Sequence, residues 1–265
     1  GRTALEEYLE QVVGPGVILV AAAGNDGARS IHVGHYFSDE TKRFGFTGIP
    51  WSKPSEVSVE LWSAHSGDVK LALELWEDGQ RKSSLSLSSS GDDYMEARLT
   101  HNHIRVADIT YGVEMADHGM VKRTLLIDPD ICPRGGTTAQ VVVVVEGSGR
   151  VDGWITQSDH RYGLSTFDKV EKAGWLTGNS QRSITVPATG KALITVGSYS
   201  VRQKWRSSDD QEHQAGQAEM GSLSSFSSRG PVLVDGAEII KPDIVAPGSM
   251  IISARALSVP PSMQT

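Results

Sequence analysis

The sequence predicts an α/β domain whose parallel sheet is interrupted by an antiparallel β-sandwich. Two observations predict this division. Continuous apolar runs, which are typical of strands covered on both faces of a parallel sheet, occur near the two ends of the chain, at 17–23, 192–199 and 241–248. Alternating apolar and polar residues, which are typical of strands with one buried face, fill the region between them.

A helix is predicted at the start of the chain. Thr3 with Glu6 three residues later is a capping-box pattern, and apolar residues recur at helical spacing between positions 5 and 13. Gly-Pro-Gly at 14–16 ends that helix. The apolar run 17–23 then follows as a strand, and this succession is typical of α/β folds.

The middle of the chain has a different pattern. In segments 56–62 and 69–76, apolar residues occupy every second position, and turn residues at 77–79 and 90–92 separate such segments. Many short strands with few helices predict an antiparallel sandwich of about 150 residues. We place it at 29–183.

After the sandwich, the first pattern returns. The runs 192–199 and 241–248 are predicted as further strands of the parallel sheet. The polar stretch 202–220 between them is interpreted as a solvated loop. The α/β part is therefore expected to comprise 1–28 and 184–265.

Composition excludes several function classes. The formal net charge is −7 and no basic block is present, which argues against nucleic acid or an anionic membrane surface as a partner. The longest apolar runs, 17–23 and 141–145, are too short to span a bilayer. With a single cysteine, Cys132, no internal disulfide can form. The chain opens without methionine or a signal-peptide pattern, so we expect it to be cut from a longer protein.

Four segments resemble the subtilisin-like serine proteases, the subtilases, and follow one another in that family's order. They are GVILVAAAGNDG (16–27), VPATGKALITVGSY (186–199), SLSSFSSRGP (222–231) and KPDIVAPGSMIISA (241–254). The resemblance implies a partial subtilisin-like parallel-sheet domain, with the sandwich inserted between Asn25 and the loop that contains Pro187. A jelly-roll-like sandwich at this position is similar to that of the bacterial germination-protease branch of the family.

The resemblance also gives the residues after the first strand a role. In subtilases this strand lines the primary specificity pocket, where small residues leave room for a substrate side chain, and Ala22, Ala23 and Gly24 match that wall. The asparagine that follows donates its side-chain NH₂ to the oxyanion of the tetrahedral intermediate, and Asn25 matches it. Asp26, beside the pocket, would favour a basic substrate side chain by Coulomb attraction.

The strings that carry the family's catalytic triad, D-[ST]-G, H-G-T and G-T-S-M-A-x-P, are not present in the sequence. By the resemblance, the Asp and His would lie upstream of this chain and the Ser downstream. Ser262-Met263 is similar to the S-M pair, but Pro260-Pro261 replace Gly-Thr, so an ordinary loop is the preferred interpretation. We therefore expect a fragment of a serine endopeptidase that works through an acyl-enzyme. By itself the fragment, which supplies only Asn25 and the pocket wall, is expected to be inactive.

No metal site or cofactor is predicted. His101 and His103 alternate along an expected strand, but no third ligand is near them in the sequence. Asp128 and Asp130 flank Pro129, which favours a turn over a calcium loop. A structural calcium ion therefore has no supporting motif in this sequence.

The expected partner of the whole enzyme is a peptide or protein substrate, and the resemblance implies a secreted or cell-envelope location. A truncated parallel sheet would leave an unpaired strand edge and uncovered apolar surface. The isolated chain is therefore expected either to self-associate through that edge or to hold the α/β part loosely while the sandwich stays ordered. The alternative hypothesis is a pseudoprotease or binding module whose sandwich recognises a protein partner or a glycan. Its aromatic residues would suit such a platform, although core packing is preferred for them: Trp51, Trp62, Trp76, Trp154, Tyr94 and Tyr111.

Overall fold

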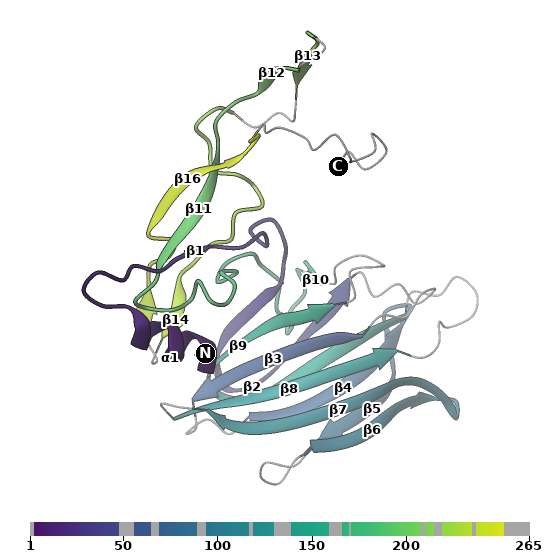
Figure 1. The fold of residues 1–265 in the computed structure, drawn as a ribbon. Coiled ribbons are helices and arrows are strands. Elements are labelled where there is room, and N and C mark those ends of the chain that lie inside the picture. The colour runs from purple at the N-terminus through teal and green to yellow at the C-terminus, as the bar shows by residue number, and fades with distance from the viewer. Residues whose placement is uncertain are drawn as a thin grey trace, which may run out of the picture.

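The computed structural model describes most of the chain. The described residues are 3–47, 56–64, 69–88, 94–116, 119–129, 139–158, 166–169, 171–207, 210–214, 219–234 and 237–251. Strands dominate these ranges, which contain one helix, α1 (Ala4–Val12). The strands form a three-stranded parallel sheet, a large antiparallel sheet and two small hairpins (Figure 1). The described part is therefore richer in strand and poorer in helix than the α/β expectation.

The parallel sheet contains β1 (Val20–Ala22), β11 (Ile194–Ser200) and β16 (Ile244–Ser249), with β11 in the centre. Ala22 lies opposite Val196, which in turn lies opposite Ile244. The prediction that the three apolar runs form neighbouring parallel strands is confirmed.

The two faces of this sheet differ in burial. One face packs on a small apolar cluster that contains Ala23, Ile184, Ala188, Val232 and Val234. The last two residues belong to β14 (Val232–Val234), which forms a hairpin with β15 (Ala237–Ile239). On the sheet, Val20 is 63% exposed and Ile244 54% exposed. The expectation of uncovered apolar surface is confirmed for the described residues, whereas burial on both faces is not.

Helix α1 has the capping box that the sequence predicts. The Thr3 hydroxyl accepts the Glu6 N–H, and the Glu6 carboxylate accepts the Thr3 N–H at 2.8 Å. Glu6 is buried and also accepts a hydrogen bond from the Thr189 hydroxyl, while Glu10 accepts the Lys191 N–H at 2.6 Å. The helix therefore docks through its acidic side chains, and its apolar residues Leu5, Tyr8 and Val12 are exposed instead of forming its buried face.

The antiparallel sheet contains nine strands. They are β2 (His32–Thr47), β3 (Val57–Ala64), β4 (Val69–Glu77), β5 (Gln80–Leu87), β6 (Tyr94–His101), β7 (Ile104–Ala116), β8 (Met120–Pro129), β9 (Ala139–Ser158) and β10 (Thr166–Phe167). All pairings between them are antiparallel, as the alternating pattern predicts.

Strand β9 belongs to both halves of this sheet. Its residues 139–147 pair with β4, its residues 151–158 pair with β3, and β2 pairs with both parts. Where the first part ends, Gly147 has φ of 154° and Gly149 has φ of 87°, values that favour glycine. The sheet therefore turns a corner at this point, so that its two halves can face each other.

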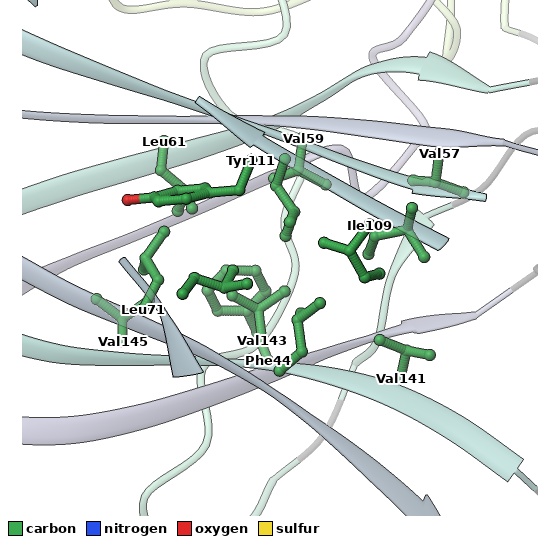
Figure 2. Packing of buried hydrophobic residues seen from close by; sticks show 14 of the residues in the cluster. Phe44, Val57, Val59, Leu61, Leu71, Ile109, Tyr111, Val141, Val143 and Val145 are labelled. Carbon is green, nitrogen blue, oxygen red and sulfur yellow. The ribbon is translucent and has the colours of Figure 1, made fainter. Parts of the chain in front are cut away.

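The core lies between the two halves. Figure 2 shows Val59, Leu61 and Tyr111 on one side and Leu71 and Val143 on the other, with their side chains pointing toward one another. These residues are 3% exposed or less. The arrangement is that of two packed layers with an apolar interior, in which each strand alternates inward and outward residues.

The polar stretch 202–220 differs from the predicted loop. It contains the hairpin of β12 (Lys204–Arg206) and β13 (Glu212–Gln214), where Trp205 stacks on His213 with ring centroids 5.4 Å apart. The hairpin lies beyond β11 and β16, at the side of the parallel sheet away from the antiparallel sheet (Figure 1). Within the described ranges, no helix combines the length and apolar character that crossing a membrane would require.

A charged cluster is buried on the outer side of β4. Glu74 is 3% exposed, and its carboxylate accepts hydrogen bonds from Arg43 at 2.9 Å, Trp76 at 2.8 Å and Arg81 at 3.2 Å. Burial alone would raise the pKa of the Glu74 carboxyl, but these hydrogen bonds hold it below its usual value. The folded state therefore favours ionised Glu74 more than the unfolded state does.

We expect Glu74→Gln to lower the free energy of unfolding by about 1–3 kcal/mol at neutral pH, because it weakens the charge-assisted hydrogen bonds that the buried carboxylate accepts from the partly exposed Arg43 and Arg81. Since the folded pKa is depressed, this contribution is present above the unfolded pKa of about 4.3 and is lost as pH falls through the folded value. Urea unfolding of wild type and variant between pH 7 and pH 3 measures the difference. Glu146→Gln, at an exposed carboxylate on β9, is the control, and equal losses in both variants would contradict the prediction.

Candidate functional site

The candidate site is the turn that follows β1, residues 24–27. Gly24 has φ of 108°, and a Cβ there would lie 2.5 Å from the Thr185 hydroxyl oxygen and 2.9 Å from that of Ser228. Both the backbone conformation and the lack of space explain why glycine ends the alanine run.

Three backbone contacts hold the turn on the segment 226–228. The Gly27 N–H donates to the Phe226 carbonyl at 2.8 Å, the Asp26 N–H to the Ser228 hydroxyl at 3.0 Å, and the Ser228 N–H to the Gly24 carbonyl at 3.0 Å. Just before the turn, the Ala23 N–H donates to the Val196 carbonyl, and the Ala23 carbonyl accepts the Thr185 N–H. The turn is therefore fixed at every residue that flanks Asn25.

The site residues predicted from the sequence differ in their exposure to solvent. Asn25 and Ala22 are exposed, and Gly24 and Asp26 are half-buried, whereas Ala23 is buried in the small apolar cluster. The Asn25 amide is thus presented to solvent from a fixed backbone. Ala23 backs the strand, while Ala22 and Gly24 remain accessible to a ligand.

Asp26 is already paired within the chain. Its carboxylate accepts a hydrogen bond from the Arg29 guanidinium, and the Asp26 carbonyl accepts the Arg29 N–H at 2.9 Å. An ion pair of this kind reduces the attraction that the carboxylate exerts on a further cation. The geometry therefore gives little support to a preference of Asp26 for basic substrate side chains.

Sequence reasoning missed the supporting role of three buried serines. The Ser227 hydroxyl accepts the Ser198 N–H at 3.0 Å, the Ser224 hydroxyl bonds the Ser198 hydroxyl at 2.8 Å, and Ser228 holds Asp26 as described. The run SLSSFSSRGP carried this signal, because closely spaced serines can satisfy backbone groups where two segments meet.

A second unpredicted pair ties the central strand to β16. The buried Lys241 ammonium donates to the Leu193 carbonyl at 2.5 Å and to the Asp243 carboxylate at 2.7 Å, which also accepts the Thr195 N–H. Burial would raise the pKa of the Asp243 carboxyl, but these donors hold it below its usual value. The contacts fix the start of β16 beside β11.

The weaker metal candidates are not brought together. β6 ends at His101, and His103 lies in the β6–β7 turn with φ of 64°, so the expected alternation along one strand is wrong. Among the described residues, no group of three His, Cys, Asp or Glu side chains could hold a metal ion. Asp130 and Ser262 lie outside the described residues.

The aromatic residues of the sandwich differ in their surroundings. Tyr111 is in the core, Tyr94 is exposed, and the indole N–H of Trp154 donates to the Arg182 carbonyl at 2.8 Å. Trp76 packs edge-on against Trp175, with ring centroids 5.5 Å apart. The indole N–H of Trp62 donates to Glu60, and Trp51 lies outside the described residues. The strand registers place Tyr94, Trp62 and Trp154 on the same outer face of the sheet, whereas Tyr111 lies in the core.

Comparisons with known proteins agree on one family. A family model described as the subtilase family matches residues 79–264. A solved structure of the Clostridium perfringens CspB protease is similar to this chain, with a TM-score of 0.62 and 21% identity. The match covers 96% of this chain but 46% of that one, so the chain spans about half the length of that protease. A search of curated proteins finds no match. The family match includes the segment 226–228 but begins after Asn25.

We expect Gly27→Ala to displace the turn, because a Cβ at Gly27 would lie 1.9 Å from the Ser227 carbonyl oxygen. Backbone cannot move aside as a flexible side chain does, so a loss of about 1–3 kcal/mol of local stability is expected. Hydrogen exchange of the Asp26 and Ala23 amides measures it. Gly14→Ala, where nothing lies within 4 Å, is the control, and equal protection in both variants would refute the close-approach argument.

Proposed function

This chain belongs to the subtilase family, and we propose that it is part of a serine endopeptidase to which it contributes the oxyanion-hole asparagine, Asn25. The observation that carries the proposal is the turn at 24–27, which is fixed by backbone hydrogen bonds while Asn25 itself is exposed. The substrates are peptides or proteins, and the reaction is hydrolysis of the peptide bond through an acyl-enzyme.

The rigidity of the turn supports this role for Asn25. Negative charge develops on the carbonyl oxygen of the substrate only as the bond is attacked, so a donor held in place beforehand stabilises the transition state more than the ground state. A donor on a mobile loop would lose part of this benefit, because it would have to be ordered during the reaction. The contacts of the turn with Phe226 and Ser228 remove that cost.

The same strand end would form part of the specificity pocket. Ala22 is exposed and Gly24 half-buried, so both leave space beside Asn25, and Ala23 supports them from the buried side. A small-residue wall admits a bulky substrate side chain into an apolar slot. Asp26 borders this space with its charge paired to Arg29.

The proposal also concerns the architecture. The chain leaves the parallel sheet after β1 and returns to it at β11, and the antiparallel strands lie between these two points. We interpret them as a jelly-roll-like insert, at 29–183, in a subtilisin-like α/β domain formed by 1–28 and 184–265. Family membership supports a secreted or cell-envelope location. No cofactor, metal ion, nucleic acid or membrane belongs to the proposed activity.

The test uses the full-length product of the gene that encodes this chain. We expect it to label with a serine-directed fluorophosphonate and to cleave peptides, and we expect Asn25→Ala to lower kcat by about 10²–10³ with little change in KM, the range that loss of this donor costs in subtilisin. Gln80→Ala, which removes an exposed amide on β5, is the control.

The 265-residue chain by itself is expected neither to label nor to cleave, because its sequence has none of the triad strings. Stoichiometric labelling of any serine in it, Ser262 included, would contradict the proposal. A full-length product that neither labels nor cleaves would favour the pseudoprotease alternative instead.

We further propose that the isolated chain self-associates through the uncovered face of the parallel sheet. Val20 and Ile244 are exposed there, and β1 is an edge strand of the described sheet. Size-exclusion chromatography with light scattering should show a dimer, and Val20→Lys should convert it to monomer. Ile104→Lys, at an exposed residue of the antiparallel sheet, should not, and a wild-type chain that is monomeric at all concentrations would refute the idea.

A further inference from the structure

Residues 179–185, which we name the strap, contact the chain on both sides of the candidate turn. Before the turn, the Thr185 N–H donates to the Ala23 carbonyl at 3.0 Å. After the turn, at the first residue of β2, His32 and Asn179 exchange two backbone hydrogen bonds, at 3.1 Å and 2.8 Å. The turn that carries Asn25 is therefore spanned by a single short segment of seven consecutive residues.

The middle of the strap is held by the antiparallel sheet. The Trp154 indole N–H on β9 donates to the Arg182 carbonyl at 2.8 Å. The Arg182 guanidinium lies 3.7 Å from the Asp152 carboxylate on β9 and pairs with Glu238 on β15. The buried Arg182 side chain therefore lies between Asp152 of the antiparallel sheet and Glu238 of β15. The strap backbone also bonds the segment 229–230, through the Arg182 N–H to the Gly230 carbonyl at 3.2 Å and the Ser183 N–H to the Arg229 carbonyl at 2.8 Å.

The buried side chain of His32 completes this cluster. Its Nε2 lies 3.0 Å from a carboxylate oxygen of Asp152, and its Nδ1 lies 3.0 Å from the side-chain oxygen of Asn179. That amide oxygen also accepts the Gln181 N–H at 3.0 Å, which fixes the orientation of the Asn179 amide. Both ring nitrogens therefore face acceptors, and both bonds form only when each nitrogen carries a proton.

Asp152 gives His32 an anionic partner, which it shares with Arg150 and Arg182. Burial alone would raise the pKa of the Asp152 carboxyl, but hydrogen bonds from His32 and Arg150 hold it well below its usual range, so Asp152 is an anion. The Trp154 ring lies 5.0 Å from the His32 ring, at a distance where an aromatic face attracts a cation. The charged groups around His32 are Asp152 and Arg150 on β9, Arg182 on the strap and, beyond it, Glu238 on β15.

We propose that His32 and Asp152 are positioning residues: a doubly protonated His32, paired with Asp152, locks the strap and thereby the turn that presents Asn25. Residues of the antiparallel sheet would then fix the position of the turn that carries Asn25, in addition to forming their own core. The consequence for catalysis rests on the function proposed above for Asn25. The effect of His32 and Asp152 on the turn does not rest on that function, so its test can fail while the proposed peptidase function stands.

The first measurement is the protonation of the His32 ring in the isotope-labelled 265-residue chain, read from imidazole ¹⁵N shifts at pH 7.5. A free imidazole is mostly neutral at that pH. We expect both His32 nitrogens to be protonated in wild type and one to lose its proton in Asp152→Asn. A neutral His32 ring in the wild-type chain would overturn the proposal.

The second measurement is hydrogen exchange of the Asp26 and Gly27 amides, with Val143 in the sandwich core as the reference. In Asp152→Asn we expect exchange at the turn to be at least about tenfold faster while Val143 is unchanged. Glu40→Gln, which breaks the half-exposed His35–Glu40 pair on the same strand β2, is the matched control and should change neither.

If Asp152→Asn does not fold, Trp154→Phe removes the indole N–H that bonds the Arg182 carbonyl and keeps an aromatic ring in place. In this variant, hydrogen exchange of the Asp26 and Gly27 amides should become faster than in wild type, by a smaller factor than in Asp152→Asn. Unchanged exchange at the turn, or an equal acceleration at Val143, would overturn the proposal, because the cluster would then have no specific effect on the turn.

Discussion

The fold depends on closing a long excursion of the chain. β1 and β11 are neighbours in one sheet, yet nine strands lie between them in the sequence. β1 and β11 can pair only if the two ends of the segment that joins them lie close together. The backbone pair between His32, where the excursion starts, and Asn179, where it ends, provides that closure. Once it forms, Thr185 reaches Ala23, and β11 follows in register with β1.

The two sheets obtain their stability in different ways. In the described residues, the antiparallel sheet surrounds a buried cluster of aliphatic and aromatic side chains to which all nine of its strands contribute. The parallel sheet has a much smaller cluster on one face. It is held largely by hydrogen bonds of polar side chains, such as Ser227 to Ser198 and Lys241 to Asp243. Buried polar groups need such specific partners, so their geometry is more restrictive than apolar packing.

The sequence patterns predicted the strands because burial on one face imposes a period of two, and the capped helix because its cap is local. The turn at Asn25 could be placed from four segments that resemble one family. The burial of Glu6 and the serines that hold the turn could not be predicted, because each depends on residues distant in the sequence. The hairpin β12–β13 is local, but its strands are largely exposed and so carry no period-two apolar pattern. Glu6 is buried since Thr189 meets it, and no pattern within the helix contains that information. The same is true of the pair His32 and Asp152.

The difference in packing between the two sheets matters for the candidate site, which lies at the end of a strand of the parallel sheet. Local stability follows the number of buried apolar contacts, so the parallel sheet, with one face open in the described residues, is expected to be the less stable part. The role proposed for Asn25 nevertheless requires its amide to be fixed to within a fraction of an ångström of its working position. The better-packed antiparallel sheet can supply that rigidity only through the segments that touch both, and the strap is one of these because it contacts Asp152 and Trp154 on one side and Ala23 on the other. On the proposal made for the strap, the antiparallel strands that follow Asn25 in the sequence stabilise the candidate site.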